Sequence, residues 1–134
     1  MLFNIFILRK YMKYPAIAKI IILKGVDNVT LPENVKFQAL SEAGQLLFKQ
    51  GNYEESGKAL GKAGNTQALN EATSWLRSQG RYKQASYFIR HSGDKKLIEE
   101  CAMDCMHQGF LSEAVTLYEM TGNTSMVAFI KENF

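Results

Sequence analysis

Glycine recurs at a fixed interval along the C-terminal three-quarters of this 134-residue chain. Two series of glycines and two series of polar residues are each spaced by 29 residues. These series are Gly51, Gly80 and Gly109; Gly64, Gly93 and Gly122; Glu42, Glu71 and Glu100; and Gln50, Gln79 and Gln108. A fixed period of this kind is the sequence signature of stacked repeat architectures. The chain therefore divides into units 36–64, 65–93 and 94–122, followed by a partial unit 123–134.

Each unit has the pattern of two antiparallel helices. In the second unit, residues 66–78 place apolar side chains at helical spacing, and residues 82–91 do the same after a short turn. Gly80 and Gly93 supply the left-handed conformation that ends helices, and Asp94 caps the helix that follows. One hairpin cannot bury its apolar face alone, so neighbouring units must stack. The sequence predicts an all-α protein: a right-handed α-solenoid of antiparallel helical hairpins with a 29-residue repeat.

The residues before the first unit fall into two segments. Residues 1–26 contain five basic residues and no acidic residue, whereas the rest of the chain carries 11 basic and 13 acidic residues. Pro15 favours a helix start, so residues 15–23 are predicted as the second helix of a degenerate repeat, with residues 2–13 as its first. Residues 27–35 connect this part to unit one. Within them, Thr30 and Glu33 match a capping box, with Thr30 as the N-cap.

The apolar start of the chain raises the question of membrane contact. Residues 1–8 are apolar but too few to span a bilayer. Residues 1–14 could rest on an anionic membrane as an amphipathic helix, although packing against the next helix is the favoured interpretation. Met12 is an alternative start to Met1. The mildly acidic body argues against a nucleic-acid partner, whose binding normally needs a basic patch on the folded surface.

The segment from Cys101 to His107 contains the residue types of a metal site, but the repeat favours a structural interpretation. On a helix, Cys101 and Cys105 share a face while His107 points away from it. Cys101 also occupies the small-residue column of the repeat, as expected for a buried thiol. The sequence therefore predicts no metal, no cofactor and no catalytic residue. Free thiols weakly favour a reducing compartment, and a cytoplasmic location is expected.

The unrepeated residues are the candidates for specific binding. Trp75 stands in a column that also holds an aspartate, so it is expected either to line a groove between repeats or to pack on the next unit. Together with Trp75, the nearby residues Arg77, Arg81 and Tyr82 form a basic and aromatic group. The last half-unit has an apolar side without a following helix, which predicts self-association or docking through the C-terminal helix. The predicted protein-binding residues are Trp75, Arg77, Arg81, Tyr82, Phe129 and Phe134.

The turn sequences resemble a known family of repeats. Gln-Gly-Asn-Tyr-Glu-Glu-Ser at 50–56, Lys-Ala-Gly-Asn at 62–65, Gln-Gly-Arg-Tyr-Lys-Gln-Ala at 79–85 and Ser-Gly-Asp at 92–94 are tetratricopeptide-like. They are most similar to the α-solenoids that follow the WD40 propellers of coatomer and intraflagellar-transport subunits. The resemblance covers residues 36–134 and implies a non-catalytic segment that helps to assemble a transport or coat complex. The chain departs from that family in having no propeller.

The favoured function is therefore a protein-protein interaction scaffold or adaptor rather than an enzyme. Two alternatives remain open at this stage. The repeats could form a regulatory module of a larger enzyme, or the chain could be a membrane-peripheral protein anchored by its N-terminus.

Overall fold

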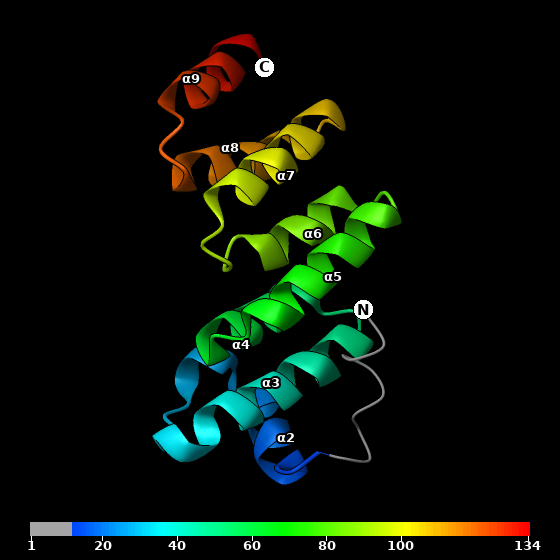
Figure 1. Ribbon diagram of the computed structural model, residues 1–134, viewed down its shortest axis with the longest axis vertical. Helices are drawn as coiled ribbons and strands as arrows, with labels where there is room; N and C mark the ends of the chain where they lie inside the picture. Colours follow the sequence, from blue (N-terminus) through cyan, green and yellow to red (C-terminus); the bar gives the residue numbers. More distant parts are fainter. Residues whose placement is uncertain (1–11) are drawn as a thin grey trace.

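The computed structural model describes residues 12–134, which are helical throughout apart from short connections. The helices, in chain order, are α2 (Pro15–Lys24), the short 3-10 helix η2 (Val26–Asn28), α3 (Glu33–Lys49), α4 (Tyr53–Ala63), α5 (Thr66–Ser78), α6 (Tyr82–Ile89), α7 (Lys95–His107), α8 (Leu111–Met120) and α9 (Thr124–Asn133). This part of the chain contains no strand, so the prediction of an all-α protein is confirmed. The helices follow one another along the long axis of the molecule, from α2 to α9 (Figure 1).

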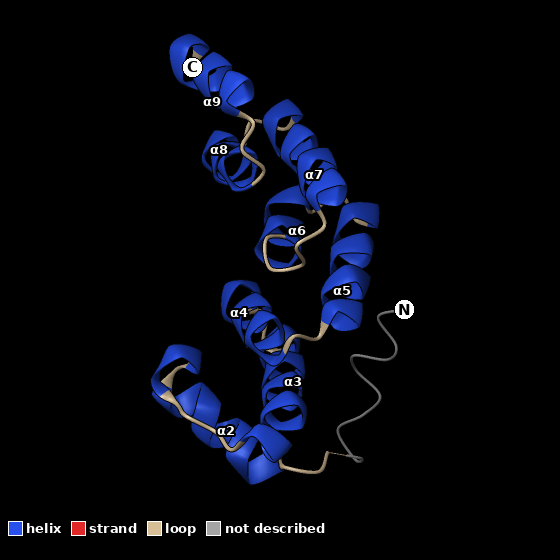
Figure 2. Cartoon of the chain, turned by 60° about the vertical axis from the view of Figure 1, so that its left-hand side comes forward, coloured by secondary structure: helices blue, strands red, loops and turns tan. Residues whose placement is uncertain are grey.

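The helices begin at regular intervals. Tyr53, Tyr82 and Leu111 open α4, α6 and α8 at a spacing of 29 residues. The starts of α5, α7 and α9 keep the same spacing. Consecutive helices run in opposite directions, and α5 and α7 lie on one side of the stack with α4, α6 and α8 on the other (Figure 2).

Glycine turns impose this spacing. Gly51, Gly80 and Gly109 have φ angles of 79°, 70° and 84°, a left-handed region that side chains with a Cβ rarely adopt. At each of these turns the amide of the following residue donates to a carbonyl five residues earlier. One example is Asn52 N to Leu47 O at 2.9 Å. This bond is the mark of the Schellman motif, which closes a helix and sends the chain back along it.

Asparagine or aspartate caps four of the helices, as predicted for Asp94 and its equivalents Asn65 and Asn123 and, in addition, at Asn52. The side chains of Asn52, Asn65, Asp94 and Asn123 each accept a hydrogen bond from the backbone amide three residues later. Such a bond satisfies one of the amides that the first turn of a helix leaves without a partner.

The start of α3 corrects one prediction. The helix begins at Glu33 after Pro32, and no side chain caps it, so the predicted capping box with Thr30 as N-cap is wrong. Pro32 fixes the backbone angle and has no amide to satisfy, which reduces the need for a cap. The prediction of a helix after Pro15 is confirmed by α2, which ends at Lys24 with Gly25 as its C-cap. The helix predicted for residues 2–13 falls almost wholly outside the described residues.

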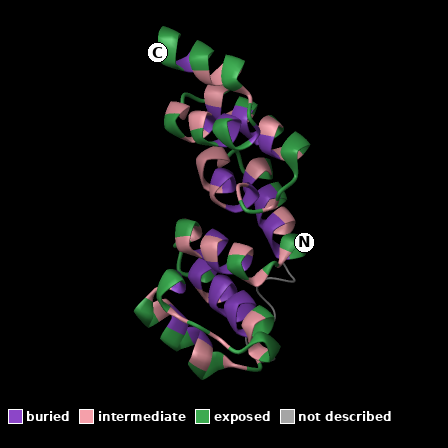
Figure 3. Cartoon of the chain, turned by 90° about the vertical axis from the view of Figure 1, so that its left-hand side faces the viewer, coloured by how far each residue is buried: buried purple, intermediate pink, exposed green. Residues whose placement is uncertain are grey.

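The apolar core runs through the stack as three successive clusters (Figure 3). The first joins α2 to α3 and α4, the second joins α3 to α6, and the third joins α6 to α9. Each cluster is shared by neighbouring helix pairs, as expected when no hairpin can bury its own apolar face. Among the residues described, no helix is both long enough and apolar enough to cross a membrane.

Glycines bring α4 and α6 unusually close. A Cβ on Gly57 would lie 2.1 Å from the backbone oxygen of Tyr87, and one on Gly61 would lie 2.7 Å from the Cβ of His91. These separations are far below van der Waals contact, so only glycine fits at this crossing.

Candidate protein-interaction surface

Trp75 and Tyr82 are half-buried and pack against the core clusters. Trp75 packs on the second cluster, with its ring 6.0 Å from that of Phe48. Tyr82 packs on the third cluster. Of the two interpretations considered for Trp75, the structure supports packing against a neighbouring unit.

The two predicted arginines are held by residues of adjacent units. Arg77 Nε donates to Asp104 at 2.8 Å, and its Nη1 lies 3.7 Å from Glu100. Arg81 Nη1 donates to the Tyr53 hydroxyl at 3.1 Å, and the guanidinium lies 5.1 Å from the centre of that ring. Arg77 thus ties α5 to α7, and Arg81 ties the turn before α6 to the start of α4. The two arginines that the sequence placed in one basic and aromatic group therefore contact different neighbouring helices.

A groove lies beside Arg77 on the exposed side of α7. Its volume is about 600 Å³, and we call it the α7 groove. It is lined by Arg77, Lys96, Glu99, Glu100, Met103, Asp104, Tyr118, Asn123 and Met126. These residues come from α5, α7, α8 and the start of α9, so the groove exists only because successive hairpins stack. The volume is comparable with that of pockets that hold small molecules or a short peptide segment.

Apolar and charged groups alternate across the α7 groove. Met103 is 45 % exposed and Met126 is half-buried, which gives the groove a flexible thioether lining. Lys96 is exposed and forms no ion pair within residues 12–134. The carboxylates of Glu100 and Asp104 face Arg77. The groove therefore offers an apolar strip bordered by both signs of charge.

Glu99 fixes one end of the groove. Its carboxylate accepts hydrogen bonds from the Thr121 hydroxyl at 2.5 Å and from Asn123 Nδ2 at 3.0 Å. These two bonds favour the ionised form and hold the pKa of Glu99 below its usual value. Because Asn123 also caps α9, this contact ties the last helix to α7. The side-chain amide of Asn65 donates the corresponding bond to the Ser41 hydroxyl at 3.0 Å, and both residues lie two repeats before Asn123 and Glu99.

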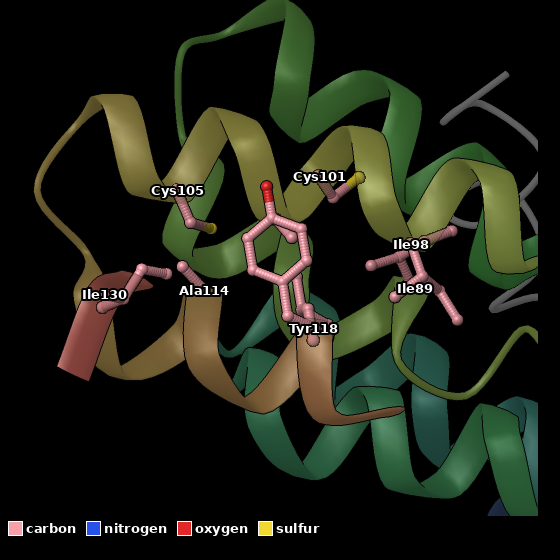
Figure 4. Close-up of a cluster of buried hydrophobic side chains, with 9 residues drawn as sticks. Ile89, Ile98, Cys101, Cys105, Ala114, Tyr118 and Ile130 are labelled. Atoms are coloured by element: carbon pink, nitrogen blue, oxygen red, sulfur yellow. The ribbon is translucent and has the colours of Figure 1, made fainter. Parts of the chain in front are cut away.

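The two cysteines line the core below the groove. Cys101 and Cys105 are buried on α7, and the ring of Tyr118 reaches up from α8 between them (Figure 4). Burial raises the pKa of each thiol to about 12, so both are protonated at neutral pH. His107 is exposed at the end of the helix. The described residues contain no group of three or more side chains placed to hold a metal ion.

The Tyr118 hydroxyl, like Gln45 Oε1 and Asn70 Oδ1, is a buried polar atom without a hydrogen-bond partner in the described residues. Tyr118 as a whole is only 2 % exposed. Burial raises the pKa of this phenol, which keeps it neutral. A buried hydroxyl without a partner costs free energy, so this position is a weak point of the third cluster.

The C-terminal aromatic residues do remain accessible. Phe129 is 46 % exposed and Phe134 is 73 % exposed, and their rings meet edge to face at 6.3 Å. Ile130, the next residue of α9 after Phe129, is buried in the third cluster. Of the six predicted binding residues, these two are therefore exposed, Arg77 lines the groove, and the other three are held in contacts within the chain.

Sequence reasoning did not find the principal members of the groove, Lys96, Met103 and Met126. Lys96, Glu99, Glu100 and Met103 form one stripe of α7 at helical spacing, and all but the half-buried Glu99 are exposed. The one feature of the sequence that could have indicated this groove was a methionine in an otherwise charged stripe. Comparison of the chain with protein-family models, curated proteins and solved structures found no match.

Proposed function

We propose that this chain is a non-catalytic scaffold or adaptor, a right-handed α-solenoid of 29-residue hairpins that binds a partner polypeptide in the α7 groove. The observation that carries the proposal is the groove itself, because it is assembled from two successive hairpins and the helix α9 and contains an exposed methionine. Methionine surfaces adapt to different apolar side chains, which suits recognition of a peptide.

The groove chemistry favours a polypeptide over a small charged ligand. Lys96 and the carboxylate of Glu100 stand on the same exposed face of α7, so a segment with both an acidic and a basic residue would find a counter-charge for each. An apolar side chain next to the basic residue would cover Met103, which lies one helical turn beyond Glu100. Since the ionic contacts are exposed, burial of Met103 is expected to supply most of the affinity.

A second part of the proposal concerns assembly. The resemblance of the turns to coatomer and intraflagellar-transport solenoids supports a role in a transport or coat complex. The exposed pair Phe129 and Phe134 supports docking or self-association through α9. Both ideas extend the scaffold proposal and do not depend on the identity of the partner in the groove.

Quantitative affinity capture from the native cell tests the scaffold proposal. The baits are the unaltered chain, Met103→Lys and the matched control Met120→Lys. Met120 is 50 % exposed on α8 and does not line the groove, so both substitutions change a similarly exposed methionine. We expect at least one protein to be lost with Met103→Lys and retained with Met120→Lys. Identical sets of captured proteins for all three baits would contradict a role for the groove.

A further inference from the structure

Helix α2 has two faces of different character. Ala18 and Ile21 are fully buried against α3, which fixes the orientation of the helix. The opposite face is a continuous exposed stripe, which we call the α2 outer face. It consists of Pro15, Ala16, Lys19, Ile20, Leu23 and Lys24. Some apolar side chains of α2 therefore remain exposed after the helix has packed on α3.

Large aliphatic side chains stand out from the α2 outer face. Leu23 is 87 % exposed and Ile20 is 49 % exposed. The face continues into a shallow depression of about 330 Å³ between α2 and the end of α3, lined by Lys19, Ile22, Leu23, Leu46, Lys49 and Gln50. An isolated exposed leucine is ordinary, but aliphatic residues next to an apolar depression form a patch.

The charges around this patch all have one sign. Lys19, Lys24 and Lys49 are exposed and form no ion pair within residues 12–134. Of the acidic groups on α3 and in the turn after α2, Glu42 is buried and accepts three hydrogen bonds, and Asp27 lies 3.9 Å from Lys58. Residues 1–26 as a whole contain no acidic residue. Unpaired lysines that border exposed aliphatic side chains are the composition of a surface that binds anionic lipid headgroups.

We propose that the α2 outer face binds the surface of an anionic lipid bilayer. Leu23 and Ile20 enter the boundary between headgroups and acyl chains, while Lys19, Lys24 and Lys49 contact the lipid phosphates and carboxylates. The helix lies in the plane of the surface, because its other face stays packed on α3. The rest of the stack then extends away from the bilayer, and the α7 groove remains accessible. This proposal is independent of the function proposed for the groove.

Co-sedimentation of the full chain with vesicles tests the proposal. One set of vesicles is phosphatidylcholine alone, and the other is phosphatidylcholine with phosphatidylserine. The variants are Leu23→Glu on the α2 outer face and Phe134→Glu at the far end of the stack, a control that also replaces a strongly exposed apolar residue with an acid. Circular dichroism of each variant establishes that the helices are retained.

We expect the unaltered chain to bind the anionic vesicles at least about tenfold more tightly than the neutral ones, and to be released at about 0.5 M salt. Leu23→Glu should weaken this binding by about tenfold or more, whereas Phe134→Glu should not change it. Absence of binding to anionic vesicles would overturn the proposal. Binding that survives in Leu23→Glu would also overturn it, because the contact would then lie elsewhere in the chain.

Discussion

Gly57 controls the distance between α4 and α6. The intrinsic preferences of residues for helices predict that alanine at this position stabilises the protein by up to about 1 kcal/mol. The structure predicts the reverse, because the new Cβ would meet the backbone oxygen of Tyr87 at 2.1 Å. We expect Gly57→Ala to lower the free energy of unfolding by about 1–3 kcal/mol, as measured by urea denaturation.

Gly51→Ala provides the contrast for this experiment. Gly51 has a φ of 79° and no other group within 4 Å of an added Cβ, so its substitution costs about 1 kcal/mol through the backbone alone. Only the Gly57 variant should shift the amide resonance of Tyr87. A Gly57→Ala protein that is more stable than the original would show that α4 and α6 do not cross at this distance.

The buried thiols allow a second test at the residue scale. Because the pKa of Cys101 and Cys105 is raised to about 12, almost no reactive thiolate is present at neutral pH. Iodoacetamide, followed by mass spectrometry, should label the folded chain at least about 100-fold more slowly than the chain in denaturant. Rapid labelling of the folded chain at either residue would contradict their assignment to the core.

At the scale of single elements, the attachment of α2 depends on one buried carboxylate. Glu42 on α3 is 1 % exposed and accepts hydrogen bonds from the backbone amides of Lys13 at 2.9 Å and Tyr14 at 2.8 Å. The side chain of Gln38 donates a third bond. No side chain caps the start of α2; Glu42, from the neighbouring helix α3, instead holds the two backbone amides that precede Pro15.

We expect Glu42→Ala to cost about 2–3 kcal/mol of unfolding free energy, because it leaves two partly buried amides without this acceptor. Amide hydrogen exchange should show faster exchange at Lys13, Tyr14 and α2 than elsewhere. Glu100→Ala is the matched control, since Glu100 occupies the same repeat column but is exposed and should cost less than about 1 kcal/mol. Equal losses for the two variants would contradict a special role for Glu42.

The repeat explains which elements could be predicted. The glycine turns and the caps at Asn65, Asp94 and Asn123 depend on local backbone chemistry, so a single sequence identifies them. The start of α3 was missed because Pro32 opens that helix without the predicted cap. Asn123 caps α9 and also donates a hydrogen bond to Glu99. The second contact could not be predicted from the sequence because it depends on how two units stack.

At the scale of the whole molecule, the candidate site combines predictable and unpredictable parts. The regular helix starts bring Arg77, Met103 and Met126 to one groove, although they lie almost 50 residues apart in sequence. Their conjunction depends on the angle between successive hairpins, and the 29-residue spacing does not specify that angle. For the same reason, the sequence could not determine that Arg81 would be used within the stack, on Tyr53.

The central claim is that the α7 groove binds a partner polypeptide. The most direct measurement is photo-crosslinking in the native cell, with a photoreactive amino acid placed at position 103 and, as the matched control, at position 120. We predict a discrete crosslinked species of higher mass from position 103 and none from position 120. Crosslinking that is absent from position 103, or equal at the two positions, would contradict the claim.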